Sequence, residues 1–98
     1  MTDPNENNNK TKALFITLIQ QLQMQGWISL GRIKDPKTDK IERNLEMAVY
    51  TIDTLEMFRE KTTGNLDDDE MKLLEESLAI LKQSYTEEVQ KRDENPSE

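Results

Sequence analysis

The stretch that decides the fold is KTTGNLDDDEM, residues 61–71, because it ends one helix and begins another within a few positions. Gly64 can adopt the left-handed conformation that often terminates a helix. Asp67 and Glu70 have the spacing of a capping box, in which each side chain bonds the other residue's backbone amide at a helix start. Two helices joined by so short a turn run antiparallel, so the stretch predicts an αα-hairpin.

Apolar residues recur every three or four positions on both sides of this turn, as on one face of a helix. The first helix of the hairpin is predicted over about residues 40–63, with Asp39 and Glu42 as a second capping box. The second helix is predicted over about residues 68–90. The two apolar seams consist of Ile41, Leu45, Ala48, Ile52 and Leu55, and of Met71, Leu74, Leu78, Leu81 and Tyr85.

The N-terminal part of the chain predicts a third helix, over about residues 11–30, that carries no charge from residue 13 to residue 31. Gly31 is placed to end it. Its apolar residues fall on two opposite sides, so we expect it to pack on the hairpin with an apolar face left over. The predicted contact residues are Phe15, Ile19, Leu22, Trp27 and Ile28.

The expected architecture is a single all-α domain of three helices, spanning residues 11–90, between polar tails at residues 1–10 and 91–98 that are predicted to be disordered. Charged and apolar residues each make up 34% of the chain, so the core is thin. A domain of this size gains much stability from any further burial. The spare apolar face therefore predicts a homo-oligomer, most simply a symmetric dimer.

Composition argues against catalysis and against metal or cofactor binding. The chain has no Cys and no His, which removes thiolate chemistry, the commonest general base and the commonest metal ligand. The acidic run Asp67-Asp68-Asp69-Glu70 lacks the spacing of a calcium loop and is better explained as a helix cap. We therefore expect no enzyme, no cofactor and no metal site, and the polar N-terminus predicts a cytosolic protein.

Three functions remain open. The first is a self-associating helical interaction or adaptor protein. The second is a membrane-surface protein using residues 11–30, although its four glutamines and missing basic face count against this. The third is a weak binder of nucleic acid or another anion through the loop at residues 32–40. The net charge of −7, which arises entirely within residues 65–98, makes nucleic acid an unexpected partner. The basic residues of the loop are Arg32, Lys34, Lys37 and Lys40.

Several short stretches resemble a family of small bacterial proteins catalogued as domain of unknown function DUF1844. The resemblance covers about residues 14–88 and implies a helical bacterial protein, but no activity and no functional residues. Its most specific part is Lys61-Thr62-Thr63-Gly64-Asn65-Leu66. The other matching stretches are Leu30-Gly31, Asp35-Pro36, Asn44-Leu45-Glu46, Ile52-Asp53-Thr54-Leu55-Glu56, Leu73-Leu74 and Tyr85.

Overall fold

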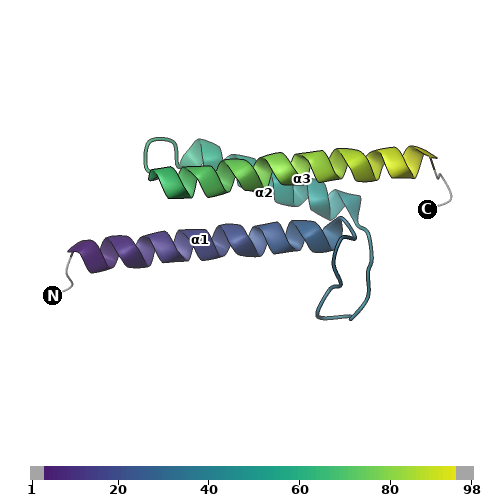
Figure 1. Ribbon diagram of the computed structural model, residues 1–98, viewed down its shortest axis with the longest axis horizontal. Helices are drawn as coiled ribbons and strands as arrows, with labels where there is room; N and C mark the ends of the chain where they lie inside the picture. The colour runs from purple at the N-terminus through teal and green to yellow at the C-terminus, as the bar shows by residue number, and fades with distance from the viewer. Residues whose placement is uncertain (1–3, 95–98) are drawn as a thin grey trace.

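The computed structural model describes residues 4–94, which form three α-helices: α1 (Pro4–Ser29), α2 (Leu45–Lys61) and α3 (Asp68–Glu94) (Figure 1). Within these described residues there is no strand, only an isolated β-bridge between Asp35 and Lys40. The predicted all-α fold of three packed helices is confirmed.

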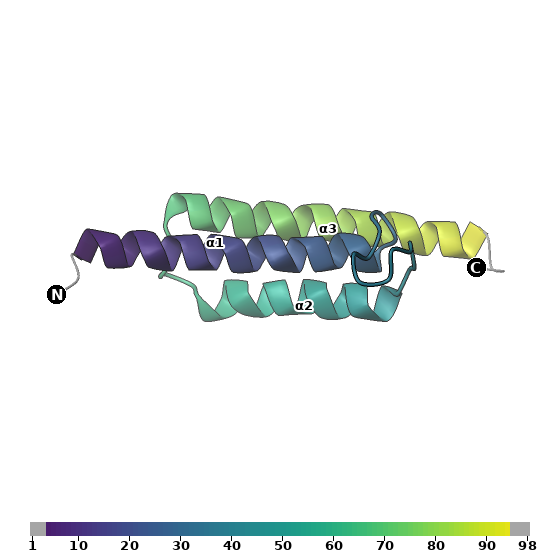
Figure 2. The same cartoon turned by 90° about the horizontal axis from the view of Figure 1, so that it is seen from below.

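The three helices lie side by side along one axis. α2 and α3 form the predicted antiparallel hairpin, and α1 lies over the groove between them, in contact with both (Figures 1 and 2). α1 therefore runs antiparallel to α2 and parallel to α3. The bundle is elongated, 59 Å long and 28 by 16 Å across, so much of each helix remains near the surface.

The hairpin turn is built as the sequence predicts. The backbone amide of Glu70 donates to Asp67 Oδ1, and the amide of Asp67 donates to Glu70 Oε1, both at 2.9 Å. Gly64 has a φ of +84°, in the left-handed region. The helix before it ends earlier than predicted, at Lys61, with Thr62 as its C-cap. Gly64 thus lies beyond the C-cap and redirects the chain toward α3.

The start of α2 differs from the prediction. The helix begins at Leu45, and its N-cap is Asn44, whose side chain accepts a hydrogen bond from the Met47 amide. Asp39 is not a cap: it adopts a φ of 56° in a tight turn. The residues before Asn44 are needed to close a loop, because the Asn44 amide donates to the carbonyl of Ser29 at 2.8 Å.

The first and last helices, α1 and α3, both extend into segments that were predicted to be tails. α1 begins at Pro4 rather than near residue 11, and α3 continues to Glu94 rather than ending near residue 90. Propagating an existing helix needs no new nucleus. Just after the extension of α1, Lys12 forms ion pairs with Asp67 and Asp69 at the start of α3. Residues 1–3 and 95–98 of those tails lie outside the described residues.

The core lies along the bundle axis and draws on all three helices. Gly26 lets α1 approach α3 closely, because a Cβ atom at this position would lie 2.8 Å from Leu81 Cδ2. Ile41, predicted to belong to the apolar seam, is instead exposed, because it lies in the loop before α2. The buried apolar residues are Ile19, Leu30, Ala48, Ile52, Leu55, Leu74, Leu78 and Leu81.

Candidate functional site

The five predicted contact residues of α1 occupy different environments. Ile19 is 0% exposed, so it belongs to the core and cannot form a surface contact. Phe15 and Leu22 are half-buried and pack against the core, with the Phe15 ring edge-to-face on Phe58 at a centroid distance of 6.5 Å. Trp27 also packs against the core. These side chains form the inner stripe of α1, which serves the chain's own hairpin.

The remaining apolar surface lies mainly on the side of the bundle formed by α1 and α2. Leu14 and Tyr50 are each 63% exposed, which is unusual for such large side chains. Leu18 lies one turn after Leu14 on α1, and the exposed α2 residues lie on the flank of that helix toward α1. We call this surface the α1–α2 face; its exposed residues are Leu14, Leu18, Met24, Met47, Tyr50 and Met57.

Along the α1–α2 face, uncharged side chains of α1 and α2 contact one another. Gln25 Nε2 donates to Thr51 Oγ1 at 2.8 Å and also approaches Met47 Sδ at 3.6 Å. Ion pairs cannot form along the central and C-terminal part of α1, because residues 13–31 have no ionisable side chain. Since burying a neutral surface avoids the cost of desolvating charges, this face is suited to contact with another protein.

The α2–α3 side of the bundle is different. Glu56 pairs with Lys82, and Arg59 Nη1 lies 3.3 Å from Glu75 Oε2. All four of these side chains are substantially exposed, so the pairs are hydrated. This surface is typical of one that faces water.

A groove opens at one end of the α1–α2 face, between the two helices and the loop that joins them. Its volume is about 810 Å³. Ile28, the fifth predicted contact residue, is half-buried and lines this groove together with Met24 and Met47. The other lining residues are Gln21, Gln25, Ser29, Asp35, Pro36, Lys37, Glu42 and Asn44.

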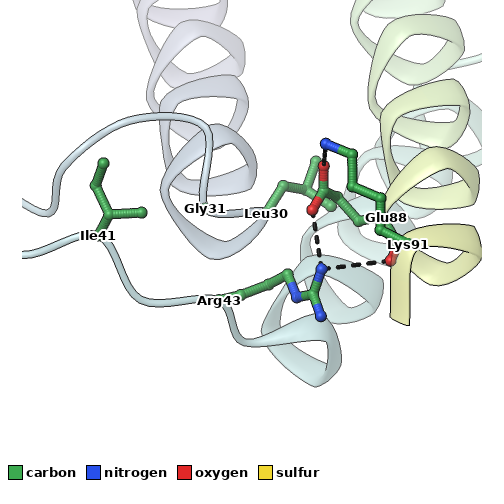
Figure 3. A pocket seen from close by; sticks show the side chains of 6 residues that line it. All are labelled: Leu30, Gly31, Ile41, Arg43, Glu88 and Lys91. Carbon is green, nitrogen blue, oxygen red and sulfur yellow. Dashed lines mark hydrogen bonds and ion pairs between the residues drawn. The ribbon is translucent and has the colours of Figure 1, made fainter. Parts of the chain in front are cut away.

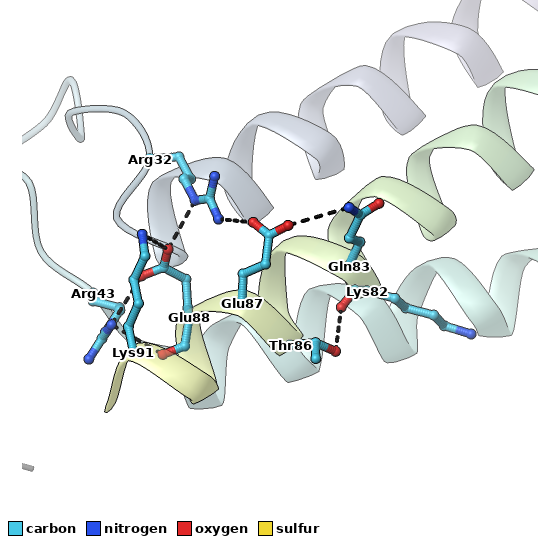
Figure 4. A network of polar contacts seen from close by, with 8 residues as sticks. All are labelled: Arg32, Arg43, Lys82, Gln83, Thr86, Glu87, Glu88 and Lys91. Atoms are coloured by element: carbon cyan, nitrogen blue, oxygen red, sulfur yellow. Dashed lines mark hydrogen bonds and ion pairs between the residues drawn. The ribbon is translucent and has the colours of Figure 1, made fainter. Parts of the chain in front are cut away.

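A cluster of charges holds the same loop to α3. Glu88 is 6% exposed and accepts from Arg43 Nη1 at 3.0 Å, Arg32 Nε at 3.1 Å and Lys91 Nζ at 3.0 Å (Figure 4). Arg32 also pairs with Glu87 at 2.9 Å. Because Arg32 and Arg43 lie at opposite ends of the loop, one carboxylate fixes both ends.

A shallow pocket of about 530 Å³ lies beside this cluster, lined by Leu30, Gly31, Ile41, Arg43, Glu88 and Lys91 (Figure 3). Its charged side chains point toward one another, and both Arg43 and Lys91 contact Glu88. The pocket is therefore a depression over the contact between the loop and α3.

Glu88→Gln is expected to lower the free energy of unfolding by about 2 kcal/mol, because it removes charge-assisted hydrogen bonds to a buried carboxylate. Burial tends to raise the pKa of Glu88, but hydrogen bonds from Lys91 and Arg43 outweigh it and hold the pKa below its usual value. This stabilisation is present above the unfolded-state pKa and is lost as the pH falls through the lower folded-state pKa.

Urea titrations of the parent protein and of the Glu88→Gln variant, at a series of pH values, measure this loss of stability. The stability difference should be full near neutral pH and should shrink under acid conditions, starting near pH 4.3, the usual glutamate pKa. Glu75→Gln, which removes a carboxylate from an exposed pair, is the matched control and should change stability by less than about 1 kcal/mol. Equal effects of the two substitutions would contradict the role assigned to Glu88.

Several other residues considered from the sequence make contacts within the chain. Asp67 and Glu70 cap α3, and among the side chains that the structure describes no group of three or more Asp or Glu residues could hold a metal ion. In the basic loop, Arg32 is engaged by Glu87 and Glu88, and Lys34 lies 3.9 Å from Asp39. In the described part of the chain, no helix has the length and apolar character needed to span a bilayer.

The sequence matches the family described as "Domain of unknown function (DUF1844)" over residues 12–87. The match runs from Lys12, which pairs with Asp69 of α3, to Glu87, whose carboxylate pairs with Arg32, so it takes in the whole hairpin turn and the core. No curated protein and no solved structure matches the chain. Because the matched segment is most of the chain and agrees with the resemblance seen in its short motifs, the protein belongs to the DUF1844 family.

Proposed function

We propose that the protein is a non-catalytic, self-associating helical module of the cytosol, in which two copies bind each other through the α1–α2 face. The observation that carries the proposal is the exposure of six large apolar side chains on a surface whose α1 half has no charge. Exposed apolar surface of this kind, bordered by polar residues, is typical of protein–protein contacts.

The surface area of the chain supports the same proposal. A compact monomer of this mass exposes about 5,800 Å² by the usual scaling with molecular weight. This 11.5 kDa chain exposes 7098 Å². The bundle is elongated, and a dimer contact would remove part of this area from water.

The α1–α2 face is the surface on which a second copy can bind with the least electrostatic repulsion. The chain has a net charge of −7, so two copies repel one another over most of their surfaces. The uncharged outer side of α1 is the place where they can approach without opposing carboxylates. The membrane-surface alternative receives less support, because α1 has no Lys/Arg-rich face between residues 13 and 31.

Self-association predicts that thermal stability depends on protein concentration. Binding of a second folded copy stabilises the native state by mass action, so the unfolding temperature should rise as the protein is concentrated from about 1 to 100 times the dissociation constant. Circular dichroism melts over that range measure the effect. An unfolding temperature that stays constant from micromolar to millimolar protein would contradict the proposal.

A further inference from the structure

The α2 edge of the α1–α2 face bears a row of acidic side chains. Glu46, Asp53 and Glu60 follow one another at two-turn intervals, so they lie along one line of the helix beside Tyr50 and Met57. All three are exposed. Among the described residues no side chain forms an ion pair or hydrogen bond with the carboxylates of these three residues, in contrast to the carboxylates of Glu56, Glu75, Glu87 and Glu88.

The corresponding edge of α1 is neutral. Thr17, Gln21 and Met24 lie along it, and all three are exposed, as is Gln20. Glutamine amides are hydrogen-bond donors, which carboxylates can accept. The two edges of the face are therefore electrostatically unequal, and this inequality decides how two copies can meet.

Two copies that pack face to face about a two-fold axis have two possible arrangements. If the axis crosses the helices, α1 lies over α1 and α2 lies over α2, which sets the two acidic rows side by side. If the axis runs parallel to the helices, α1 of each copy lies over α2 of the other. In that arrangement each acidic row meets the neutral edge with its amides, and no like charges are opposed.

We infer that the dimer is crossed: α1 of one copy packs on α2 of the second copy, with the Gln21 edge against the Asp53 row. The inference rests on the proposed self-association and adds which surfaces meet. The positions of Gln21 and Asp53 along the bundle axis follow from contacts within one chain. Gln25 with Thr51 and Phe15 with Phe58 fix α1 against α2, and between these two contacts Gln21 and Asp53 lie at about the same height. Rotation about an axis parallel to the helices does not change a residue's position along that axis. Gln21 of one copy therefore lies level with Asp53 of the other.

Cross-linking between single-cysteine variants tests the arrangement. The chain has no cysteine, so Gln21→Cys and Asp53→Cys each introduce a lone thiol on an exposed position. The full-length variants are mixed, allowed to exchange subunits and treated with a short thiol-specific cross-linker. The mixed product should form at least about tenfold faster than either product of identical variants, because a held contact raises the effective thiol concentration to the millimolar range.

The outcomes of this experiment distinguish a failure of the crossed arrangement from a failure of self-association. Light scattering on each variant first establishes whether it is a dimer. A dimer in which the identical-variant products form fastest, or in which no product forms, overturns the crossed arrangement and leaves self-association standing. A monomer at all concentrations overturns both. A dimer dominated by the mixed product supports both.

Discussion

Leu18→Glu is expected to weaken the dimer by at least about a hundredfold, so that the variant is a monomer at concentrations where the parent protein is paired. Leu18 is 38% exposed on the α1–α2 face, one turn after Leu14. A glutamate there would be buried without a partner in the dimer, and an unpaired buried charge costs several kcal/mol. The two-fold axis repeats the substitution, so each dimer contains the charge twice.

The monomer itself should tolerate the change. Glu and Leu have similar helix propensities, and an exposed position leaves the new carboxylate in water before association. Far-ultraviolet circular dichroism should therefore be unchanged, while sedimentation velocity should show a slower species.

Ile80→Glu provides the matched control. Ile80 is 43% exposed, close to the value for Leu18, but it lies on α3 rather than on the α1–α2 face. The same apolar-to-acidic change at Ile80 should leave the dissociation constant within about twofold, as is usual for surface positions away from a contact. Equal weakening by the two substitutions would place the contact elsewhere on the bundle.

Leu81→Ala is expected to lower the free energy of unfolding by about 3–4 kcal/mol, near the middle of the usual range for a buried leucine. Leu81 is 0% exposed and fills the space above Gly26, which has no side chain. The neighbouring glycine cannot move a side chain into the cavity, so the lost contacts are not replaced. Urea unfolding at one fixed protein concentration measures the change.

The second substitution Gly26→Ala should recover part of this loss. In the parent protein the new Cβ would approach Leu81 Cδ2 to 2.8 Å, but in the Leu81→Ala background that atom is gone. The added methyl group then occupies cavity space, and alanine is favoured over glycine within a helix by about 1 kcal/mol. A double-mutant cycle should therefore show favourable coupling between the two sites. Strict additivity would show that α1 and α3 do not meet at this point.

Local signals in the sequence predicted the hairpin correctly. The capping box of Asp67 and Glu70 needs only neighbouring residues, and both of its hydrogen bonds are present. Gly31 likewise ends α1 as expected, with a φ of +75° and a hydrogen bond from the Arg32 amide to the Trp27 carbonyl. The hairpin and the end of α1 could be predicted because both are determined by interactions between residues close in sequence.

Which residues of α1 are exposed could not be predicted, because this depends on contacts between residues far apart in the sequence. Apolar residues on two sides of α1 indicated a spare face, but the pattern could not tell which side the hairpin would cover. Ile19 was therefore predicted at a contact, although it is fully buried within the chain. The exposed side includes Leu14 and Leu18, which become distinguishable only when α1 is placed over the groove between α2 and α3.

The Glu88 cluster was missed for a related reason. Its members come from both ends of the loop and from α3, and no short-range spacing connects Arg32 or Arg43 with Glu88. The misplaced start of α2 has the same origin. Asp39 and Glu42 have capping-box spacing, but closure of the loop through Ser29 and Asn44 sets the helix start at a different residue.

The solution mass of the unmodified protein, measured by light scattering over a range of concentrations, tests the central claim most directly. A mass approaching twice the 11.5 kDa of one chain as concentration rises is the predicted result. It would mean that the α1–α2 face is covered by a second copy. A mass of one chain at every concentration would contradict self-association and show that this face is left open to water or to a different protein.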